Sequence, residues 1–374
     1  AQDPGFVDLL IYASVVDDGV IVGKDGSLMA AWAYQGVDSN SSTQAERNQI
    51  SLQINHALSR MGSGWMIHID AVRKPAPGYS AKDDSHFPDP VSAAIDEERR
   101  EFFERVGTLY ESNYVITATY LPPLLAQQKF VELMFDDEGV PVDSKTRTIA
   151  LLNHFKRECA NIESHLSSVF RMKRLKGKTI TKEDNSSVNY DAFLRWIQFC
   201  ISGLDHPVIL PKNPIYLDAL LSGQEFWGGV VPKIGQNFIQ VVSIEGFPLA
   251  SSPGLINSLA DLPCLYRWST RFIFMDTHEA VGHLEKFSKK WKQKIRSFFD
   301  QVFNSHSSNV DQNAINMVSD AQAAIAETNS GEVAQGYYTS VVVLMSENRG
   351  DLEASARQVA KAINHLGFAA RIET

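Results

Sequence analysis

The stretch KDGSLMAAWAYQG, residues 24–36, decides how the fold begins. Its Asp25-Gly26 pair is typical of a tight turn, and the apolar run that follows it has the length of a β-strand. We therefore predict a turn and then a strand over residues 28–34.

A capped amphipathic helix is predicted directly after this strand. Thr43 and Glu46 have the spacing of a capping box, in which each residue satisfies a backbone N–H of the other. One helical face carries five apolar residues, Ile50, Ile54, Ala57, Leu58 and Met61. Gly62 is expected to end the helix in the left-handed conformation, and a second strand is expected over residues 65–72.

The string HFPDP, residues 86–90, precedes another predicted helix. Asp89 and Pro90 stand at the N-cap and at the first helical position, where these residue types are preferred. The apolar residues expected along it are Val91, Ala94, Ile95 and Phe102. The region therefore predicts a scaffold and contains no catalytic chemistry of its own.

Several long strings of this chain occur in the order found in one protein family. They are VDDGVIVGKDGSL, SSTQAERN, RMGSGWMIHIDAVRKPAPGY, SHFPDPVSAAIDEERR, YESNYVITATYLPP and FPLASSPGLINSLADLPCLYRWSTRFIFMD. On these strings nearly the whole chain resembles the N-terminal region of TrbE-like ATPases of conjugative type IV secretion, in the broader CagE/TrbE/VirB family.

The resemblance implies where the chemistry lies. In TrbE-like proteins the P-loop motor, with its ATP and Mg²⁺, is C-terminal to the matching region, so it would follow Thr374. The resemblance also implies a cytoplasmic position at the bacterial inner membrane. The expected partners are small membrane subunits of the secretion channel, the protein's own ATPase domain and further copies of the protein. We therefore expect an N-terminal fragment that is not itself an enzyme.

One place in the chain comes close to a P-loop. Gly177, Lys178 and Thr179 spell GKT, but Met172 stands where the motif GxxxxGK[ST] needs its first glycine. The flanking residues are basic and are typical of a connector after a helix, without a clear preceding buried strand. A plain loop is therefore predicted there.

Composition is that of an ordinary globular protein, with 44% hydrophobic and 21% charged residues among 374. The net charge of −9 argues against a protein that coats nucleic acid, although local basic patches remain compatible with it. The cysteines, Cys159, Cys200 and Cys264, are far apart and lack CxxC spacing. They suit a reducing compartment and predict neither a disulfide framework nor a zinc site.

We predict an α+β fold with two α/β-sandwich units, ferredoxin-like in type, a helix-rich middle region and a long helical hairpin. The predicted domains are an α+β domain over residues 1–135, a middle region over 136–335 with the hairpin at 277–328, and a closing strand-helix-strand unit over 336–374. In that last unit a strand is expected at 337–345 and a helix from Asp351 to a stop at Gly367. It repeats the order of residues 27–72, which suggests a duplication.

The helix predicted over residues 277–304 is the candidate interaction surface. Its apolar stripe comprises Leu284, Phe287, Trp291, Ile295, Phe298 and Val302. Its basic residues include Lys286, Lys289, Lys290, Lys294 and Arg296. Such a helix can lie on an anionic membrane or meet nucleic-acid phosphates, or its stripe can pack on the next helix, predicted over residues 310–325.

No catalytic, cofactor-binding or metal-ligating residue is predicted. His278, Glu279 and His283 resemble the zinc motif HExxH, but the second histidine comes one residue late, about 140° out of phase with the first. A capped helix start with exposed histidines is expected instead. Gly228, Gly229 and Gly235 do not form GxGxxG and are expected in turns.

The leading hypothesis is an assembly, docking and regulatory region of a type IV secretion ATPase that energises pilus or channel assembly and export. The alternative is a nucleic-acid-binding module that acts on transferred DNA through the basic helix and residues 171–182. A self-sufficient ATP hydrolase is the third hypothesis.

Overall fold

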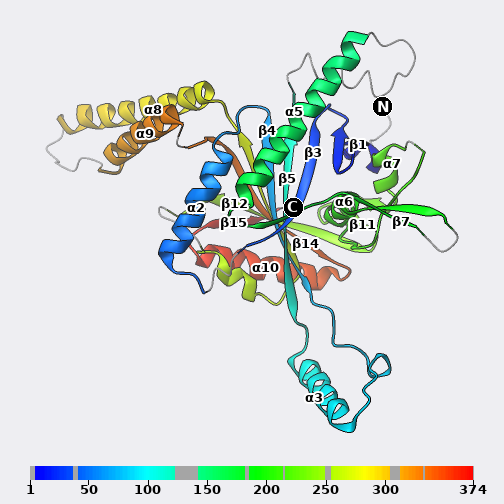
Figure 1. The fold of residues 1–374 in the computed structure, drawn as a ribbon. Coiled ribbons are helices and arrows are strands. Elements are labelled where there is room, and N and C mark those ends of the chain that lie inside the picture. The colour runs from blue at the N-terminus through cyan, green and yellow to red at the C-terminus, as the bar shows by residue number, and fades with distance from the viewer. Residues whose placement is uncertain are drawn as a thin grey trace.

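A computed structural model of the chain describes residues 5–36, 41–122, 142–181, 185–213, 215–248, 254–303, 312–331 and 333–373, shown in Figure 1. The α+β class is confirmed: the described strands form two antiparallel sheets, one of 12 strands and one of three, with helices packed against the large sheet. The sequence also predicts a short helix after Pro122 and Pro123, which lies outside the described residues.

The first half of the large sheet contains the predicted strand, helix and second strand of residues 28–72 and the predicted helix after Asp89. Its elements are α1 (Phe6–Leu9), β1 (Tyr12–Asp17), β2 (Val20–Gly23), β3 (Leu28–Gln35), α2 (Gln44–Leu58), β4 (Trp65–Pro75), η1 (Lys82–Asp84), α3 (Pro90–Val106), β5 (Tyr110–Tyr120), α5 (Val142–Leu166) and β6 (Arg171–Arg174). The predicted turn joins β2 to β3, with Gly26 at φ 79°. The capping box of α2 is present, because the Thr43 hydroxyl accepts from the Glu46 N–H and Glu46 accepts from the Thr43 N–H.

The second half repeats this arrangement. Its elements are β10 (Phe226–Trp227), β11 (Lys233–Ile234), β12 (Asn237–Gly246), η2 (Asn257–Asp261), β13 (Tyr266–Phe274), α8 (Thr277–Phe303), α9 (Gln312–Ser330), β14 (Gly336–Ser346), α10 (Arg349–His365) and β15 (Ala369–Ile372). A connecting region lies between the halves and contributes β7 (Gly177–Thr181), β8 (Ser187–Asp191), α6 (Ala192–Ser202), β9 (Ile209–Leu210) and α7 (Leu217–Leu221).

Strand order identifies each half as a ferredoxin-like unit. The first unit has the order β6-β3-β5-β4 and the second β15-β12-β14-β13, which in both is the order 4-1-3-2 of a βαββαβ motif. A short hairpin precedes each motif, β1-β2 in the first unit and β10-β11 in the second. The equivalent strands β4 and β13 pair antiparallel and join the units into one sheet.

The helices lie on defined faces of the sheet. In β3, Leu28, Ala30 and Trp32 pack with α2 and α5, whereas Met29 and Ala31 point to the opposite face and pack with α6. The strand registers place the α10 cluster on the α2 and α5 face. Each unit is thus a sandwich of one sheet layer and one helix layer. Helix α6, which belongs to the connecting region, covers the other face of the first unit's sheet.

The structure corrects details of the predictions. The left-handed glycine after α2 is Gly64, at φ 88°, and not Gly62. Helix α10 begins before Asp351 and is capped by Asn348, whose Oδ1 accepts from two backbone N–H groups, and Gly367 has the expected left-handed φ of 90°. Residues 27–72 form the first βαβ of one unit and the C-terminal segment the second βαβ of the other. The duplication is therefore of whole units, not of those two segments. The predicted domain boundaries stay predictions.

Candidate interaction site

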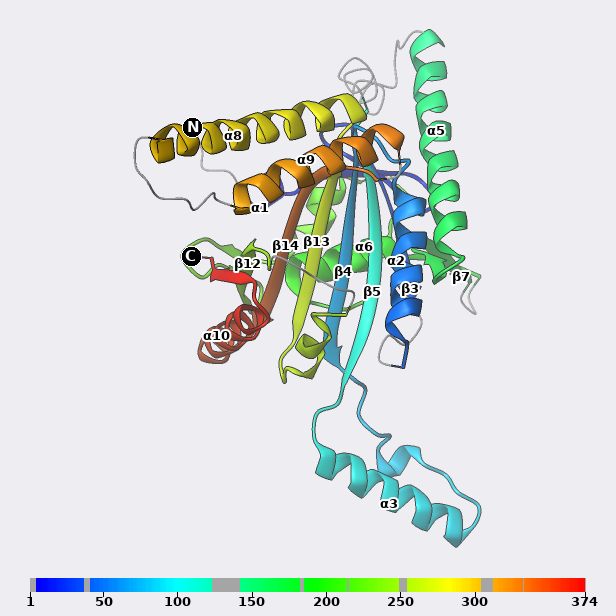
Figure 2. The ribbon, with the colours of Figure 1, turned by 90° about the vertical axis from the view of Figure 1, so that its left-hand side faces the viewer.

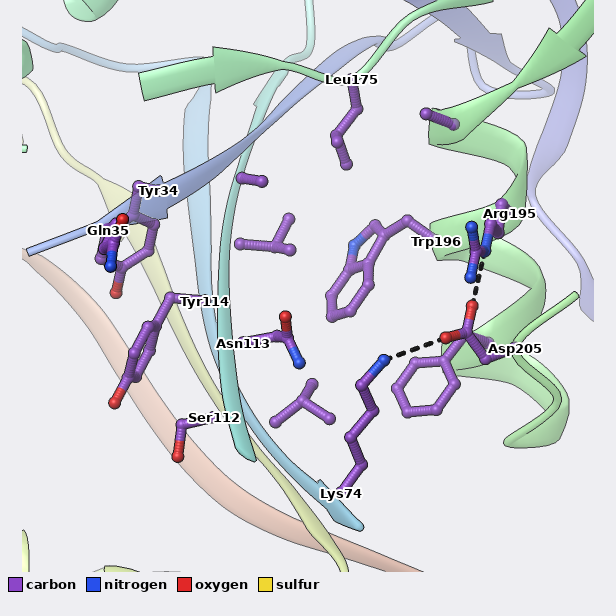
Figure 3. Close-up of a pocket in the computed structure, with 15 residues that line it drawn as sticks. Tyr34, Gln35, Lys74, Ser112, Asn113, Tyr114, Leu175, Arg195, Trp196 and Asp205 are labelled. Atoms are coloured by element: carbon purple, nitrogen blue, oxygen red, sulfur yellow. Dashed lines mark hydrogen bonds and ion pairs between the residues drawn. The ribbon is translucent and has the colours of Figure 1, made fainter. Parts of the chain in front are cut away.

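The pocket of Figure 3 lies on the face of the sheet that α6 covers, beside that helix. It has a volume of about 540 Å³. Its walls come from β3, β4 and β5, from α6 and from the loop after α6. Trp196 of α6 faces Asn113 of β5 across it, whereas the rings of Tyr34 and Tyr114 lie 5.5 Å apart on the far side of these strands (Figure 3).

A chain of ion pairs closes one side of this pocket. Asp205, in the loop after α6, accepts from Lys74 Nζ at 3.1 Å and from Arg195 Nε at 2.6 Å (Figure 3). Burial alone would raise the pKa of Asp205, but the hydrogen bonds from Arg195 and Lys74 hold that pKa below its usual range. Lys74 also lies 3.4 Å from Glu111. Both cations are thus already paired, so the pocket carries no spare positive charge for a phosphate.

The residue types around the pocket are those of a binding surface. The lining contains amide, hydroxyl, aromatic and charged side chains. Aromatic rings next to polar side chains are typical of surfaces that recognise a polypeptide.

A polar cluster is buried where the two units meet. Asp70 of β4 and Arg267 of β13 form an ion pair at 2.9 Å, and their side chains are 4% and 19% exposed. They line a cavity of about 350 Å³ together with His68, Tyr12 and Cys200. Burial lowers the pKa of His68 and raises that of Cys200 to about 12. The cluster keeps its histidine neutral and its thiol protonated, which suits a structural role.

The GKT sequence does not have P-loop geometry. Gly177, Lys178 and Thr179 lie on β7, which pairs with β8, so the predicted loop is a strand. The Gly177 N–H donates to the Asp18 carboxylate at 2.9 Å. In a P-loop these N–H groups point at phosphates from a turn between a strand and a helix. Here they are occupied by the sheet and by a carboxylate.

The HExxH-like residues form the predicted capped helix start. Asp276 caps α8 by accepting from the Glu279 N–H at 2.7 Å. His283 is exposed and its Nε2 lies 3.4 Å from the Tyr337 hydroxyl. Within the ranges described above, no cluster of three or more metal-ligating side chains occurs, and no helix has the length and apolar content needed to cross a bilayer.

The candidate interaction surface lies on the helical hairpin of α8 and α9. The two helices pack side by side, with Ser288 and Ala280 of α8 buried (Figure 1). Lys286, Lys289 and Lys290 are exposed. The side chains of Lys294 and Arg296 lie outside the described part of the helix, and a role for this surface stays a prediction.

Sequence reasoning missed the pocket and the buried cluster. Lys74 and Asp205 are 131 positions apart, and Asp70 and Arg267 are 197 apart. Nothing near any of these four charged residues in the sequence indicates its partner. Only Asp70 and Arg267 could have been suspected from the sequence. Each is a charged residue at a position of a strand that faces the core, and a charge buried there requires a partner.

The comparisons with known proteins agree with the sequence resemblance. Residues 19–128 match the model of the type IV secretion system ATPase VirB4/TrbE N-terminal domain. Residues 178–374 match the model of the CagE, TrbE, VirB family, component of type IV transporter system.

Curated relatives match along the whole chain. A conjugal transfer protein TrbE of Rhizobium radiobacter is 43% identical over 99% of this chain and 45% of its own length. In Sinorhizobium fredii a probable conjugal transfer protein TrbE is divided between two polypeptides. The first of them is 51% identical over 33% of this chain and 82% of its own length, and the second is 42% identical over 59% and 33%. This chain thus spans less than half of the Rhizobium radiobacter relative. It belongs to the CagE/TrbE/VirB family of type IV secretion components.

Proposed function

We propose that this chain is the assembly and docking region of a conjugal-transfer secretion ATPase. In this proposal ATP and Mg²⁺ are bound by a motor domain outside the chain. The chain holds the motor at channel subunits of the inner membrane and next to further copies of the protein. The match to a TrbE protein that is more than twice as long as the matched chain supports a division of this kind.

The observation that carries the proposal is the position of the two helical insertions. In each unit the link between the second and third strands of the βαββαβ motif is expanded into helices, α3 in the first and the α8–α9 hairpin in the second. Because β4 and β13 are antiparallel, the insertions leave the sheet at opposite ends, as Figure 2 shows. Two arms at opposite ends suit a protein that connects two partners.

The test is competition in a donor cell. We would express this chain in excess in a strain that carries a conjugative plasmid encoding a closely related TrbE, and measure plasmid transfer per donor. A docking region occupies the sites of the full-length protein, so transfer should fall at least tenfold. Unchanged transfer with the folded chain present in excess would refute the docking role. ATP turnover by the purified chain would refute the assignment of ATP to another domain.

A second candidate function rests on the exposed lysines of α8. Lys286, Lys289 and Lys290 could contact nucleic-acid phosphates, whose affinity for a protein falls steeply with salt. The alternative predicts DNA binding that weakens on raising the salt and on replacing the three lysines with glutamine. An absence of binding at moderate salt would remove it.

A further inference from the structure

Helix α3 is held away from the body of the molecule. The strands β4 and β5 pair along their whole length, to Pro75 opposite Tyr110, and extend the sheet into a two-stranded ribbon. Residues 76–109 form an arm at the end of this ribbon, and α3 is its helix (Figure 2). The body of the molecule therefore leaves α3 within reach of a second molecule.

One side of α3 is fixed within the arm. The Tyr79 hydroxyl donates to Asp96 at 2.7 Å, and the Tyr79 ring stacks on Phe103 with 5.2 Å between the ring centroids. Arg100 donates to Asp96 and to the Ser80 carbonyl. This network determines which side of α3 faces outward.

The outward side carries an apolar stripe that the described part of the chain leaves exposed. The stripe consists of Val91, Ile95, Phe102 and Val106, which are 69%, 48%, 54% and 46% exposed. At 100° per residue these four positions lie within about 60° of one another around the helix axis. Soluble proteins rarely leave an apolar face this open unless it is a binding surface.

The stripe is symmetric about its own midpoint. Val91 and Val106 are equally far from the point between residues 98 and 99, and so are Ile95 and Phe102. When two such helices lie antiparallel around a two-fold axis at this point, each apolar residue is level with an apolar residue of the other copy. Val91 then meets Val106 of the other copy, and Ile95 meets Phe102 of the other copy. An asymmetric stripe would set apolar residues opposite polar ones in this arrangement.

The charges at the midpoint agree with a symmetric pair. Glu98 and Arg99 flank the stripe on its two sides. In the antiparallel pair Glu98 is level with Arg99 of the other copy, so the two copies bring two charges of each sign to the centre. Arg105, which also flanks the stripe, is level with the uncharged Ser92 of the other copy. The antiparallel arrangement also sets opposite ends of the two helix dipoles side by side.

A lipid surface fits α3 less well than a second copy does. Helices that lie on anionic bilayers carry mainly lysine and arginine on their polar face. Helix α3 has three arginines, and they are outnumbered by its acidic residues, Asp96, Glu97, Glu98, Glu101 and Glu104. A flat bilayer also makes no use of the symmetric spacing of the stripe.

We propose that two copies of this chain bind each other through the α3 stripe, antiparallel around a two-fold axis between residues 98 and 99. Phe102 of each copy packs against Ile95 of the other. The inference rests on the docking role proposed above, in which copies of the protein lie next to each other, and it names the surface through which they meet. A contact between two helices of this length falls in the class below about 1,200 Å², which is typical of weak complexes.

The first test is self-association of the purified chain. Sedimentation equilibrium over about 1 to 200 µM should show a reversible equilibrium of monomer and dimer. Phe102→Ser should weaken the dimer at least tenfold, because it removes the largest apolar side chain of the stripe. Leu52→Ser is the matched control and should change it less than twofold, since Leu52 is 69% exposed on a different helix, α2. A monomer at all concentrations, or a dimer that Phe102→Ser leaves unchanged, would overturn the proposal.

A charge swap tests the midpoint. Glu98→Arg sets an arginine against Arg99 of the other copy, and Arg99→Glu sets a glutamate against Glu98 of the other copy. Each single change should weaken the dimer at least fivefold at low salt. The double variant Glu98→Arg/Arg99→Glu restores opposite charges at the same level, so its dimer should return to within twofold of the wild-type affinity. A double variant as weak as the single ones would contradict the pairing.

Disulfide trapping tests the register. Chains with Ile95→Cys and chains with Phe102→Cys, mixed and mildly oxidised, should form a linked dimer, because these two positions are level. Neither variant should link to itself, since each position lies about 10 Å from its own copy along the helix axis, beyond the Cα separation of about 7 Å that a disulfide can bridge. The wild-type chain controls for the native cysteines. Linked dimers of one variant alone that exceed those of the mixture would overturn the antiparallel arrangement.

Further measurements separate this inference from a lipid surface and from the docking role. Binding to vesicles with about 30% phosphatidylserine that is lost in Phe102→Ser would identify a lipid surface as the occupant and overturn the proposal. If the chain forms the dimer that depends on Phe102 but leaves plasmid transfer in donor cells unchanged, the docking role is refuted and the pairing stands. If the chain lowers transfer without forming the dimer, the pairing is refuted and the docking role stands.

Discussion

Removing Arg267 should destabilise the junction of the two units more than removing Asp70. Arg267→Met leaves the Asp70 carboxylate, 4% exposed, without its partner at 2.9 Å. An uncompensated buried charge of this kind costs about 3 to 5 kcal/mol. Asp70→Leu leaves a guanidinium that is 19% exposed and lines two cavities, so water can reach it. The cost should then be that of one charged hydrogen bond, about 2 kcal/mol.

The double variant Asp70→Leu/Arg267→Met completes the cycle. Both charges are gone, and apolar side chains of similar volume replace them, so its free energy of unfolding should lie within about 1 kcal/mol of the wild-type value. The assay is urea unfolding followed by tryptophan fluorescence and circular dichroism. The reasoning is refuted if Arg267→Met costs less than Asp70→Leu, or if the double variant is as unstable as the two single losses added together.

Three further predictions test the backbone, a thiol and a histidine. Gly64→Ala should lower the free energy of unfolding by about 1 to 3 kcal/mol, because φ is 88° there and the new Cβ would lie 2.8 Å from the Leu121 carbonyl oxygen. Gly62→Ala, whose new Cβ has nothing within 4 Å, should be near neutral. Thermal unfolding measures both. Cys159 should react with N-ethylmaleimide at pH 8 at least a hundredfold more slowly in the native chain than in denaturant, by peptide mass spectrometry, since burial raises its pKa to about 11. Burial lowers the pKa of His68, so the unfolded chain binds its proton first and stability should fall as pH drops below about 6.5. His68→Gln should flatten that decline in urea titrations from about pH 7.5 to 5.5.

Local signals in the sequence predicted the elements whose ends and faces are set by neighbouring residues. The capping box of Thr43 and Glu46, the N-cap at Asp89 and the stripe of α10 are all present. The pairing of α8 with α9 was also predicted as one of two alternatives, because adjacent amphipathic helices usually pack together. These features depend on residues within a few turns of each other.

Features that depend on distant pairing were not predicted. Nothing in the residues of β4 indicates that β13, about 200 positions later, becomes its neighbour. That pairing brings Asp70 and Arg267 together, and the pocket follows from the packing of α6 against β3, β4 and β5, so the ion pairs of both sites could not be found. Gly64 was missed for the same reason, since the close approach of Leu121 that requires glycine comes from a separate strand connection, whereas Gly62 fits the helix stop on local grounds alone.

The exposure of α3 shows how one pattern can predict a helix and mislead about its environment. Val91, Ile95 and Phe102 have the spacing of a core face, and the same spacing on α10 is buried against its sheet. The difference lies in topology: α10 joins two strands of one sheet and must cross it, whereas α3 interrupts a hairpin whose strands are already adjacent. A helix inserted at such a link has no sheet to cover, so its apolar face is retained only if something outside the described fold covers it. The same link in the second unit holds two helices that cover each other. The duplicated fold thus provides its own comparison, and it is α3 that lacks a partner within the described structure.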